Sequence, residues 1–346
     1  MKALVLVGGE GTRLRPLTLD TPKPALTLVD RPFIRYMVEW LGRHGVEQVV
    51  MACGFRAADL RASLGDEVPG GPAIHYVEED EPLGTGGPLR FAAERGLLGG
   101  ERFMALNGDV LTDLDLSALA AQHAEREATA TLALHPVSDP TGYGLVRRRE
   151  DGEVIEFLEK PDPSEIDTDE VNAGAYVLEP SVLELIPAGR AVSLEREVFP
   201  RLVGEGLYGR RLEGYWTDIG TPERYLEASW DILEGRVVSD VEPTAPGLLI
   251  AADARVDEGA KVGPRAVIGP ACELADRASV IDSVLLDGCR VESGGAVRGA
   301  ILAAGVEVGP DAVVEPGAVL GRGARVRPGV RIGEDARVAP GETVSV

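Results

Sequence analysis

The glycine-rich segment near the start of the chain combines the residue types that bind phosphate. It reads GGEGTR over residues 8–13 and continues to TPKP over residues 21–24. Glycine has no Cβ, so backbone N–H groups can approach phosphate oxygens closely, and Arg13 and Lys23 add fixed positive charge. The segment matches neither the dinucleotide-binding pattern G-x-G-x-x-G nor the Walker loop, which ends in Gly-Lys-Ser or Gly-Lys-Thr. We therefore expect a phosphate site of a different kind.

Two aspartates beside glycines are candidates for a metal site. Asp109 follows Gly108, and Asp218 lies two residues before Gly220. Small neighbours let a carboxylate approach a ligand, and Mg²⁺ prefers a few carboxylates together with phosphate oxygens and water. Either aspartate alone would also fit a turn or a helix cap. The two together with the basic loop favour an Mg²⁺ pair facing a phosphorylated substrate.

The charge of the whole chain limits what it can bind. Asp and Glu number 57 against 35 Lys and Arg, which gives a formal net charge of −22. Nucleic acids and anionic membranes bind basic surfaces, so we expect neither as a partner. The same charge repels a triphosphate. Any phosphate site must therefore be a local cluster of cations and backbone N–H groups, usually with a divalent cation.

Several features predict a cytoplasmic protein. No apolar run approaches the roughly 18 residues of a membrane span. The apolar run in residues 1–7 is too short for a signal peptide, and we interpret it as the first buried strand. The three cysteines, Cys53, Cys272 and Cys289, are odd in number and lack a Cys-x-x-Cys spacing. This usage indicates a reducing compartment and argues against a zinc site.

Residues 1–235 alternate short β-branched runs with helical patterns. This alternation is typical of a mainly parallel sheet covered by helices, and it predicts an α/β, Rossmann-like domain. The expected strands are 3–7, 49–52, 73–77 and 102–106, and the expected helices are 33–44, 57–64 and 89–94. Ligands bind at the carboxyl ends of parallel strands, and the loops at 8–13 and 107–109 each follow a strand directly. We expect these two loops to share one site.

A six-residue repeat replaces this alternation after about residue 235. Apolar residues recur at every sixth position from Ile250 to Leu286 and again from Leu302 to Val344, with a break in phase near residues 288–299. The repeat resembles the left-handed parallel β-helix, in which every sixth residue points inward and small residues turn the corners. It predicts a second domain over residues 236–346. Solenoids of this size commonly serve assembly, so we expect a homo-oligomer through this domain.

The string GGEGTRLRPLT, followed by PKP, resembles the nucleotidyltransferase signature of the sugar-nucleotide pyrophosphorylases. Five later motifs extend the resemblance over nearly the whole chain, and within the family they look most like mannose-1-phosphate guanylyltransferases. They are EPLGTGGP at 81–88, LNGD at 106–109, FLEKP at 157–161, NAG at 172–174 and YWTDIGTP at 215–222. The resemblance implies transfer of a nucleotidyl group from a nucleoside triphosphate to a sugar 1-phosphate, with release of pyrophosphate.

The resemblance also implies roles for individual residues. The nucleotide would be bound by Leu6, Val7, Gly8, Gly9, Gly11, Thr12, Arg13, Lys23, Glu79, Gly84, Thr85, Asn107, Gly108 and Asp109. The sugar phosphate would be bound by Gly144, Glu159, Lys160 and Asn172. Asp109 and Asp218 would hold Mg²⁺, and the catalytic residues would be Arg13, Lys23, Asp109, Lys160 and Asp218.

Glu79 aligns with the position that selects the base in this family. Guanine presents N1–H and N2–H₂ as adjacent donors, which one carboxylate can accept in bidentate fashion, whereas uracil and thymine suit an amide better. We therefore expect GTP as the nucleotide. Because residues 78–81 are all acidic, the position could also be a solvated loop. The choice of mannose 1-phosphate rests on the resemblance.

The expected reaction needs little proton transfer. A sugar phosphate oxygen is already a nucleophile, so the protein must hold two anions in line and offset their repulsion. We expect Arg13 and Lys23 to stabilise the leaving pyrophosphate and Lys160 to position the attacking group. The four histidines, His44, His75, His123 and His135, lie outside every motif and are expected to be structural or at the surface.

Three alternatives remain open from the sequence. One is a glucose-1-phosphate nucleotidyltransferase that uses UTP or dTTP, since the glycine-rich loop is shared. Another is a non-catalytic regulatory subunit that binds the sugar nucleotide. The third, an acyltransferase on the β-helix, is disfavoured because such enzymes use histidine and none follows His135. Glu10 places a negative charge inside the phosphate loop, which would weaken triphosphate binding unless Arg15 or another cation pairs with it.

Overall fold

The computed structural model describes residues 1–54, 56–159 and 162–345. The chain divides into two compact units by its internal contacts. The first contains residues 1–9 and 34–216, and the second contains residues 10–33 and 217–346. Residues 10–33 and 217–235, which sequence patterns place in the first domain, therefore pack with the repeat. Among the described residues, no helix combines the length and the apolar character that crossing a membrane requires.

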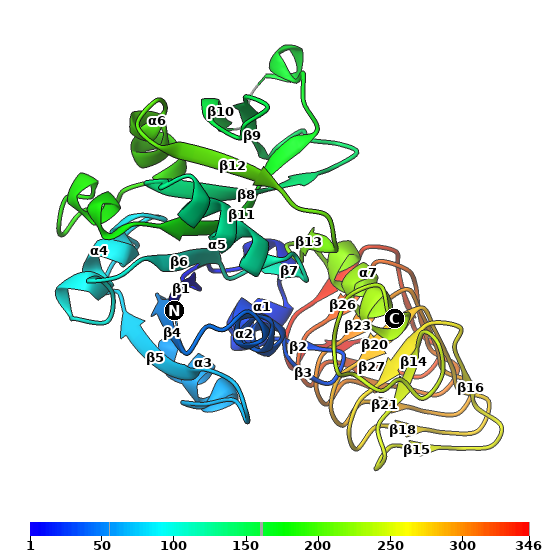
Figure 1. The fold of residues 1–346 in the computed structure, drawn as a ribbon. Coiled ribbons are helices and arrows are strands. Elements are labelled where there is room, and N and C mark those ends of the chain that lie inside the picture. The colour runs from blue at the N-terminus through cyan, green and yellow to red at the C-terminus, as the bar shows by residue number, and fades with distance from the viewer. Residues whose placement is uncertain (55, 160–161, 346) are drawn as a thin grey trace. The chain divides into compact units, whose positions relative to one another are not determined.

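The first unit is built on a mixed sheet with strand order β10-β9-β11-β6-β1-β4-β5; β8 also pairs with β11, and β12 pairs with β8 (Figure 1). The strands β1, β4, β5 and β6 run parallel to one another, and β11 runs antiparallel to β6 and β8. Their bounds are β1 (Lys2–Leu6), β4 (Gln48–Cys53), β5 (Ala73–Glu78), β6 (Phe103–Asn107), β8 (Ala130–Pro136), β9 (Gly144–Arg148), β10 (Val154–Glu159), β11 (Glu170–Leu178) and β12 (Leu207–Arg211). The predicted strands are each found to within one residue at either end.

Helices flank this sheet because each carries an apolar stripe that it must bury. They are α2 (Phe33–Arg43), α3 (Ala57–Leu64), α4 (Gly87–Glu94), α5 (Leu116–Glu125), the π-helical turn η5 (Leu194–Val198) and α6 (Phe199–Leu202). Trp40 on α2 and Tyr176 and Phe103 on the sheet are among the largest fully buried side chains. Helix α5 starts where the side chain of Asp115 accepts a hydrogen bond from Ala118 N, as an N-cap does. The predicted α/β domain is confirmed.

In the second unit, residues 248–344 wind into stacked coils whose strands form three parallel sheets (Figure 1). The first sheet is β14 (Leu248–Ile250), β17 (Ala266–Ile268), β20 (Ser283–Leu285), β23 (Ile301–Leu302), β26 (Val319–Leu320) and β29 (Arg337–Val338). The second is β15 (Arg255–Val256), β18 (Glu273–Leu274), β21 (Arg290–Val291), β24 (Glu307–Val308), β27 (Arg325–Val326) and β30 (Thr343–Val344). The third is β16 (Lys261–Val262), β19 (Ser279–Ile281), β22 (Ala296–Arg298), β25 (Val313–Val314) and β28 (Arg331–Ile332). The predicted parallel β-helix is confirmed.

The phase of the repeat differs from the prediction at Leu286. The residue in the inward row is Leu285, which pairs with Ile268 and Leu302, while Leu286 is only half-buried. The inward row takes five-residue steps from Val280 to Leu285 and from Val297 to Leu302, so two coils are one residue short. Asp282 and Gly299, which have φ of 48° and 54°, lie at these shortened corners. A left-handed residue turns the chain tightly enough to keep the apolar side chains inside.

Helix α7 (Pro222–Leu233) belongs to the second unit, and the hydroxyl of Thr221 caps its first turn by accepting from Arg224 N. Its Leu226 and Trp230 line the same groove as Ile301 of the first β-helix sheet. The hydroxyl of Tyr225 donates to Thr27 O, which ties residues 10–33 to this unit. Within that segment lie the short elements η1 (Thr12–Leu14), α1 (Leu17–Asp20), η2 (Lys23–Ala25), β2 (Thr27–Leu28) and β3 (Arg31–Pro32).

Candidate active site

The ends of β1 and β6 bring two of the predicted loops together in the first unit. Gly108 N donates to Leu6 O at 2.9 Å, so the loop after β6 turns directly over the end of β1. A Cβ on Gly108 would lie 2.5 Å from Leu6 O and 2.6 Å from Val7 Cγ1, which leaves room only for glycine. Val7 N in turn donates to Ala52 O at 3.0 Å. Residues 7–9 and Asp109 therefore belong to the same edge of the sheet, as expected for parallel strands.

The NAG segment of β11 lies next to Asn107. Gly174 has φ of +72°, and a Cβ on it would lie 2.7 Å from Asn107 Nδ2. The pairing of β11 with β8 shifts register between Asn172 and Tyr176, so the segment forms a bulge. In this bulge Asn172 Oδ1 accepts from Gly174 N at 3.0 Å and Asn172 Nδ2 donates to Tyr176 Oη at 2.8 Å. The bulge thus brings together two motifs that are 65 residues apart in the sequence.

An aromatic group covers the other side of the NAG segment. Trp216 Nε1 donates to Ala173 O at 2.9 Å. The rings of Tyr143 and His135 lie 5.4 Å and 5.8 Å from the ring of Trp216. Burial lowers the pKa of His135, which favours its neutral form beside these rings. His135 therefore packs behind the site, which agrees with the structural role expected for it.

Glu79 begins the loop that leads to Gly84 and Thr85. Its backbone N donates to Cys53 O at 2.8 Å, and its Oε2 accepts from Leu83 N at 3.1 Å. Burial raises the pKa of Glu79, and the hydrogen bond from Leu83 partly opposes that shift. Gly86 N donates to Val192 O and Val192 N donates to Leu83 O, so the loop is fixed by backbone pairing with residues near 192.

Glu195 and Tyr176 are polar residues of this region that no sequence motif indicated. Glu195 lies on η5, is 9% exposed, and its carboxylate accepts from Thr85 Oγ1 and Tyr176 Oη. Tyr176 is fully buried in β11. The spacing of Ser193 before Glu195 signals only a helix start, since Ser193 Oγ accepts from Arg196 N. The partnership depends on long-range packing, which explains why sequence patterns missed it.

In the second unit, Arg13 lies beside the TDIGTP motif. A Cβ on Gly220 would be 2.5 Å from Arg13 Nη2 and 2.7 Å from Asp218 Oδ1. Asp218 Oδ1 accepts from Gly220 N at 3.0 Å, and Asp218 Oδ2 forms an ion pair with Arg224. A cation and a carboxylate predicted to act on the same substrate are therefore neighbours.

Gly11 closes the glycine-rich loop within the second unit. A Cβ on Gly11 would lie 3.0 Å from Thr18 Cγ2 and 3.1 Å from Lys23 Cβ. Thr18 Oγ1 donates to Gly11 O at 2.9 Å, and Lys23 is 7% exposed. At the start of the loop, Glu10 pairs with Arg15 at 3.2 Å. The pairing that would offset the negative charge of Glu10 is thus present in the structure.

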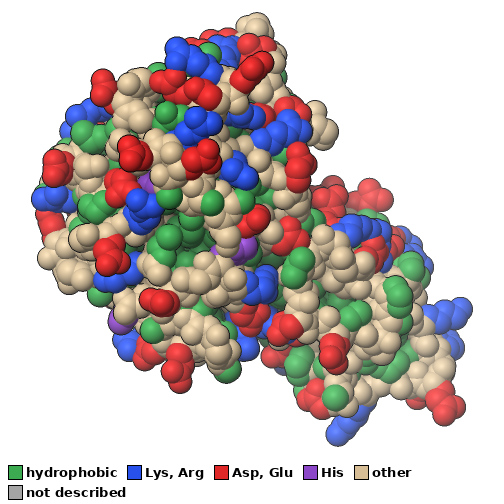
Figure 2. Space-filling model, viewed as in Figure 1, with side chains coloured by type: hydrophobic (Ala, Val, Ile, Leu, Met, Phe, Trp, Pro, Cys, Tyr) green, Lys and Arg blue, Asp and Glu red, His purple; other side chains and the backbone are tan. Residues whose placement is uncertain are grey.

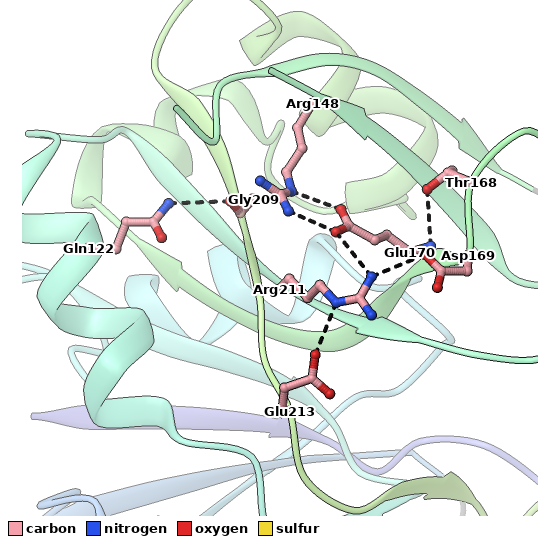
Figure 3. A network of polar contacts seen from close by, with 8 residues as sticks. All are labelled: Gln122, Arg148, Thr168, Asp169, Glu170, Gly209, Arg211 and Glu213. Atoms are coloured by element: carbon pink, nitrogen blue, oxygen red, sulfur yellow. Dashed lines mark hydrogen bonds and ion pairs between the residues drawn. The ribbon is translucent and has the colours of Figure 1, made fainter. Parts of the chain in front are cut away.

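The remaining predicted residues lie on β9 and β10. Gly144 starts β9 and pairs with Glu159, the last residue of β10. Lys160 lies outside the described residues. β9 and β12 hold β11 by arginines: Arg148 Nε and Nη2 reach the carboxylate of Glu170 at 2.8 and 2.7 Å, and Arg211 lies 3.2 Å from Asp169 (Figure 3). This network fixes the beginning of the strand that carries Asn172.

The carboxylates predicted to bind metal suit Mg²⁺ better than a metal ion whose ligands all come from the protein. The described residues contain no group of three or more His, Cys, Asp or Glu side chains that could hold a metal ion. Mg²⁺ is commonly held by one or two carboxylates together with substrate phosphates and water, so it needs no such group. Asp109 and Asp218, the residues predicted from the sequence, each offer a carboxylate of the kind that Mg²⁺ binds.

The surface charge is mixed. On the face shown in Figure 2, acidic and basic side chains are interspersed over both units. On the second β-helix sheet, Arg255, Glu273 and Arg290 alternate on consecutive coils, with N–O distances of 3.3 and 3.5 Å. Such alternation differs from the continuous basic stripe that nucleic acids require.

The sequence matches two known protein families. The family described as Nucleotidyl transferase matches residues 2–235, and the family described as GMPPB C-terminal domain matches residues 244–346. The chain is 40% identical over 309 residues to a mannose-1-phosphate guanylyltransferase of Mycobacterium tuberculosis, covering 84% of this chain and 81% of that protein. It is 36% identical over 318 residues to mannose-1-phosphate guanylyltransferase 1 of Arabidopsis thaliana, covering 91% and 84%.

A solved structure shares the fold of about two thirds of the chain. The crystal structure of HddC from Yersinia pseudotuberculosis complexed with GMP-PN superposes with a TM-score of 0.57 at 27% identity. The superposition covers 67% of this chain and 99% of that one.

Proposed function

Because the chain belongs to the nucleotidyl transferase family, we propose that it transfers a guanylyl group from GTP to mannose 1-phosphate, forming GDP-mannose and releasing pyrophosphate. The observation that carries this proposal is the meeting of the β1 and β6 ends, where Gly108 N donates to Leu6 O at 2.9 Å. Relatives named mannose-1-phosphate guanylyltransferase share this chain over more than four-fifths of its length.

The chemistry is an in-line displacement at the α-phosphorus of the nucleotide. A phosphate oxygen of the sugar phosphate forms a new bond to that phosphorus, and the bond to the bridging oxygen of pyrophosphate breaks. The attacking oxygen carries no proton that must be removed, so no general base is needed. Arg13 and Lys23 would stabilise the charge that develops on pyrophosphate, and Lys160 would hold the sugar phosphate for attack.

Asp109 and Asp218 would hold Mg²⁺, which fits their hard oxygen ligands. The ion would offset the repulsion between the two anionic substrates. In the described structure Asp218 forms an ion pair with Arg224, so this carboxylate is oriented by the first turn of α7.

The nucleotide would lie against the glycine-rich segments at residues 8–13 and 84–87 and against the loop after β6. We assign to it Leu6, Val7, Gly8, Gly9, Gly11, Thr12, Arg13, Lys23, Glu79, Gly84, Thr85, Asn107, Gly108 and Asp109. Glu79 would accept from N1–H and N2–H₂ of guanine, which supports GTP over UTP or dTTP. The hydroxyl of Thr85 already donates to Glu195, so Thr85 would meet the nucleotide through its backbone.

The sugar phosphate would be bound by Gly144, Glu159, Lys160 and Asn172. The bulge at Asn172 supports this assignment, because its side chain uses one N–H and one oxygen lone pair within the protein. A carboxamide has two N–H donors and two acceptor lone pairs, so one of each is left to meet sugar hydroxyls.

We also propose catalytic residues 1–235, a β-helix over 236–346 and a homo-oligomer formed through the β-helix. The two family matches, which end at residue 235 and begin at residue 244, support this division. A cytoplasmic location is supported by three free, buried cysteines.

A substrate matrix tests the proposed function. GTP, ATP, UTP and dTTP are each incubated with mannose, glucose or galactose 1-phosphate and Mg²⁺, and released pyrophosphate is measured. The pair GTP and mannose 1-phosphate should give the highest kcat/KM. Highest turnover with UTP or dTTP and glucose 1-phosphate would replace this assignment, and tight binding of GDP-mannose without pyrophosphate release from any pair would indicate a regulatory subunit.

A further inference from the structure

A buried carboxylate connects the loop assigned to the nucleotide with the strand assigned to the sugar. Glu195 Oε2 accepts from Thr85 Oγ1 at 2.6 Å and from Ser193 Oγ at 2.8 Å. Glu195 Oε1 accepts from Tyr176 Oη at 3.3 Å, and Tyr176 Oη accepts from Asn172 Nδ2 at 2.8 Å. Its three direct partners and Asn172 come from the loop before α4, from the cap of η5 and from β11. One side chain therefore reaches both halves of the proposed substrate site.

The chemistry of a carboxylate fixes the direction of every hydrogen bond in this cluster. A carboxylate accepts hydrogen bonds and cannot donate them. Each hydroxyl that bonds to the carboxylate must therefore donate its single proton to it. The oxygen of Tyr176 is then available only as an acceptor, and the carboxamide of Asn172 must turn its NH₂ group toward it. The other end of that carboxamide accepts from Gly174 N at 3.0 Å. The two hydrogen bonds together allow only one orientation of the Asn172 carboxamide and exclude the one in which Oδ1 and Nδ2 are exchanged.

The same argument holds for Thr85. Its hydroxyl proton goes to Glu195, and its oxygen accepts from Leu194 N at 2.8 Å. The hydroxyl thus uses its single proton and one of its two lone pairs on residues of η5, and these two hydrogen bonds hold the backbone of residues 84–86 against η5. Burial strengthens these bonds, because Glu195 is 9% exposed and Tyr176 is fully buried, and little water competes for the donors.

We propose that Glu195 is a positioning residue that sets the geometry of both substrate subsites, through Thr85 for the nucleotide and through Tyr176 and Asn172 for the sugar phosphate. This inference rests on the proposed function. Glu195 touches neither substrate. It acts by giving Asn172 a single orientation and by holding the Gly84–Gly86 loop in place.

Five single variants separate the two branches. Tyr176→Phe removes only the hydroxyl between Asn172 and Glu195, and Thr85→Val removes only the hydroxyl between the nucleotide loop and Glu195. Glu195→Gln disturbs both. Glu197→Gln is the matched control, because Glu197 lies on the same turn and accepts from Ser193 N at 3.1 Å but meets neither Thr85 nor Tyr176. Thr85→Ser restores the hydroxyl.

The readouts are KM for each substrate and, without turnover, the Kd of GTP and of mannose 1-phosphate by calorimetry. Tyr176→Phe should raise the Kd of mannose 1-phosphate about fivefold, as expected for the loss of one buried hydrogen bond, and should change the Kd of GTP by less than about twofold. Thr85→Val should raise the Kd of GTP and leave that of mannose 1-phosphate nearly unchanged. Thr85→Ser should have the parental Kd for GTP. Glu195→Gln should weaken both ligands, and Glu197→Gln neither.

The outcomes decide between positioning and a purely structural role. If the variants lower the melting temperature but leave both Kd values at the parental level, Glu195 only stabilises the fold and the inference is wrong. If Tyr176→Phe and Thr85→Val each weaken the binding of GTP and of mannose 1-phosphate equally, the inference is also wrong, because the two branches would not be separate. A parental chain that binds both ligands without releasing pyrophosphate rejects the proposed reaction while the Kd pattern still tests Glu195. A parental chain that binds neither rejects both.

Discussion

Gly220 lies directly against the guanidinium of Arg13: a Cβ on the glycine would be 2.5 Å from Arg13 Nη2. The two residues are more than 200 positions apart, yet the second unit brings the phosphate loop and the TDIGTP motif into contact. A methyl group at position 220 would have to displace the guanidinium of Arg13 or the carboxylate of Asp218, so the observed position of Arg13 requires glycine there.

Gly220→Ala should therefore displace Arg13 and lower kcat by about tenfold or more, because misplacing a group that stabilises transition-state charge is costly. The backbone of Gly220 is not in the left-handed region, so alanine there causes no backbone strain. Gly333→Ala is the control, since a Cβ on Gly333 would meet nothing within 4 Å. Equal turnover by the two variants would show that Arg13 does not act from this position.

Asp109→Asn and Asp218→Asn should each lower turnover by about 100-fold and weaken Mg²⁺ binding, because an amide is a poorer ligand than a carboxylate for a hard cation. Titration calorimetry with Mg²⁺ in the presence of GTP measures the binding directly. Asp66→Asn removes the same charge at a surface pair with Arg61 and serves as the control. Folded variants with near-parental turnover and Mg²⁺ affinity would remove the metal assignment.

The pH dependence of GTP binding should report on Glu79. Burial raises the pKa of this carboxyl, so it becomes protonated at a higher pH than an exposed glutamate. A protonated carboxyl loses one acceptor for guanine, and KM for GTP should therefore increase as pH is lowered from 8 to 5. Glu79→Gln should raise KM for GTP about tenfold and flatten this dependence. If base selectivity and the pH profile are unchanged in the variant, Glu79 does not select the base.

Glu170→Gln should destabilise the first unit by about 2 kcal/mol, because it leaves the half-buried guanidinium of Arg148 without its bidentate partner. Urea denaturation followed by tryptophan fluorescence measures the change. The pair of Arg255 and Glu273 offers a contrast, since the Arg255 side chain is 82% exposed. Arg255→Gln should change stability by no more than about 0.5 kcal/mol. A similar small effect at Glu170 would show that the network in Figure 3 contributes little.

Stability should fall as the solution is acidified below neutral pH. Burial lowers the pKa of His44, His123 and His135 in the folded protein. The unfolded chain then binds more protons than the folded one, so stability is present above the ordinary histidine pKa of about 6.5 and is lost as pH falls. Melting temperatures at pH 7.5, 6.5 and 5.5 test this. Replacing His44 and His135 by Gln should make the slope shallower, and an unchanged slope would show that these two histidines do not cause it.

Local patterns predicted most of the elements. The apolar runs of β1, β4, β5 and β6 and the six-residue repeat each reflect a requirement that neighbouring residues impose on one another. The error at Leu286 arose where two coils close with five-residue steps, because a short corner is decided by the stacking of whole coils and leaves a weak local signal. The pairing of Glu10 with Arg15 was anticipated, since the two residues are five apart in one loop.

What the sequence by itself determined is the chemistry that the chain carries: a glycine-rich loop with Arg13 and Lys23, aspartates beside glycines, and a repeat that must coil. These are properties of residue type and short spacing. The tertiary structure alone decided that Gly174 meets Asn107, that Gly220 meets Arg13, and that Glu195 is buried beneath Thr85 and Tyr176. Such contacts join residues 19 to 207 positions apart, and their geometry follows from how strands and helices pack, which no local pattern encodes.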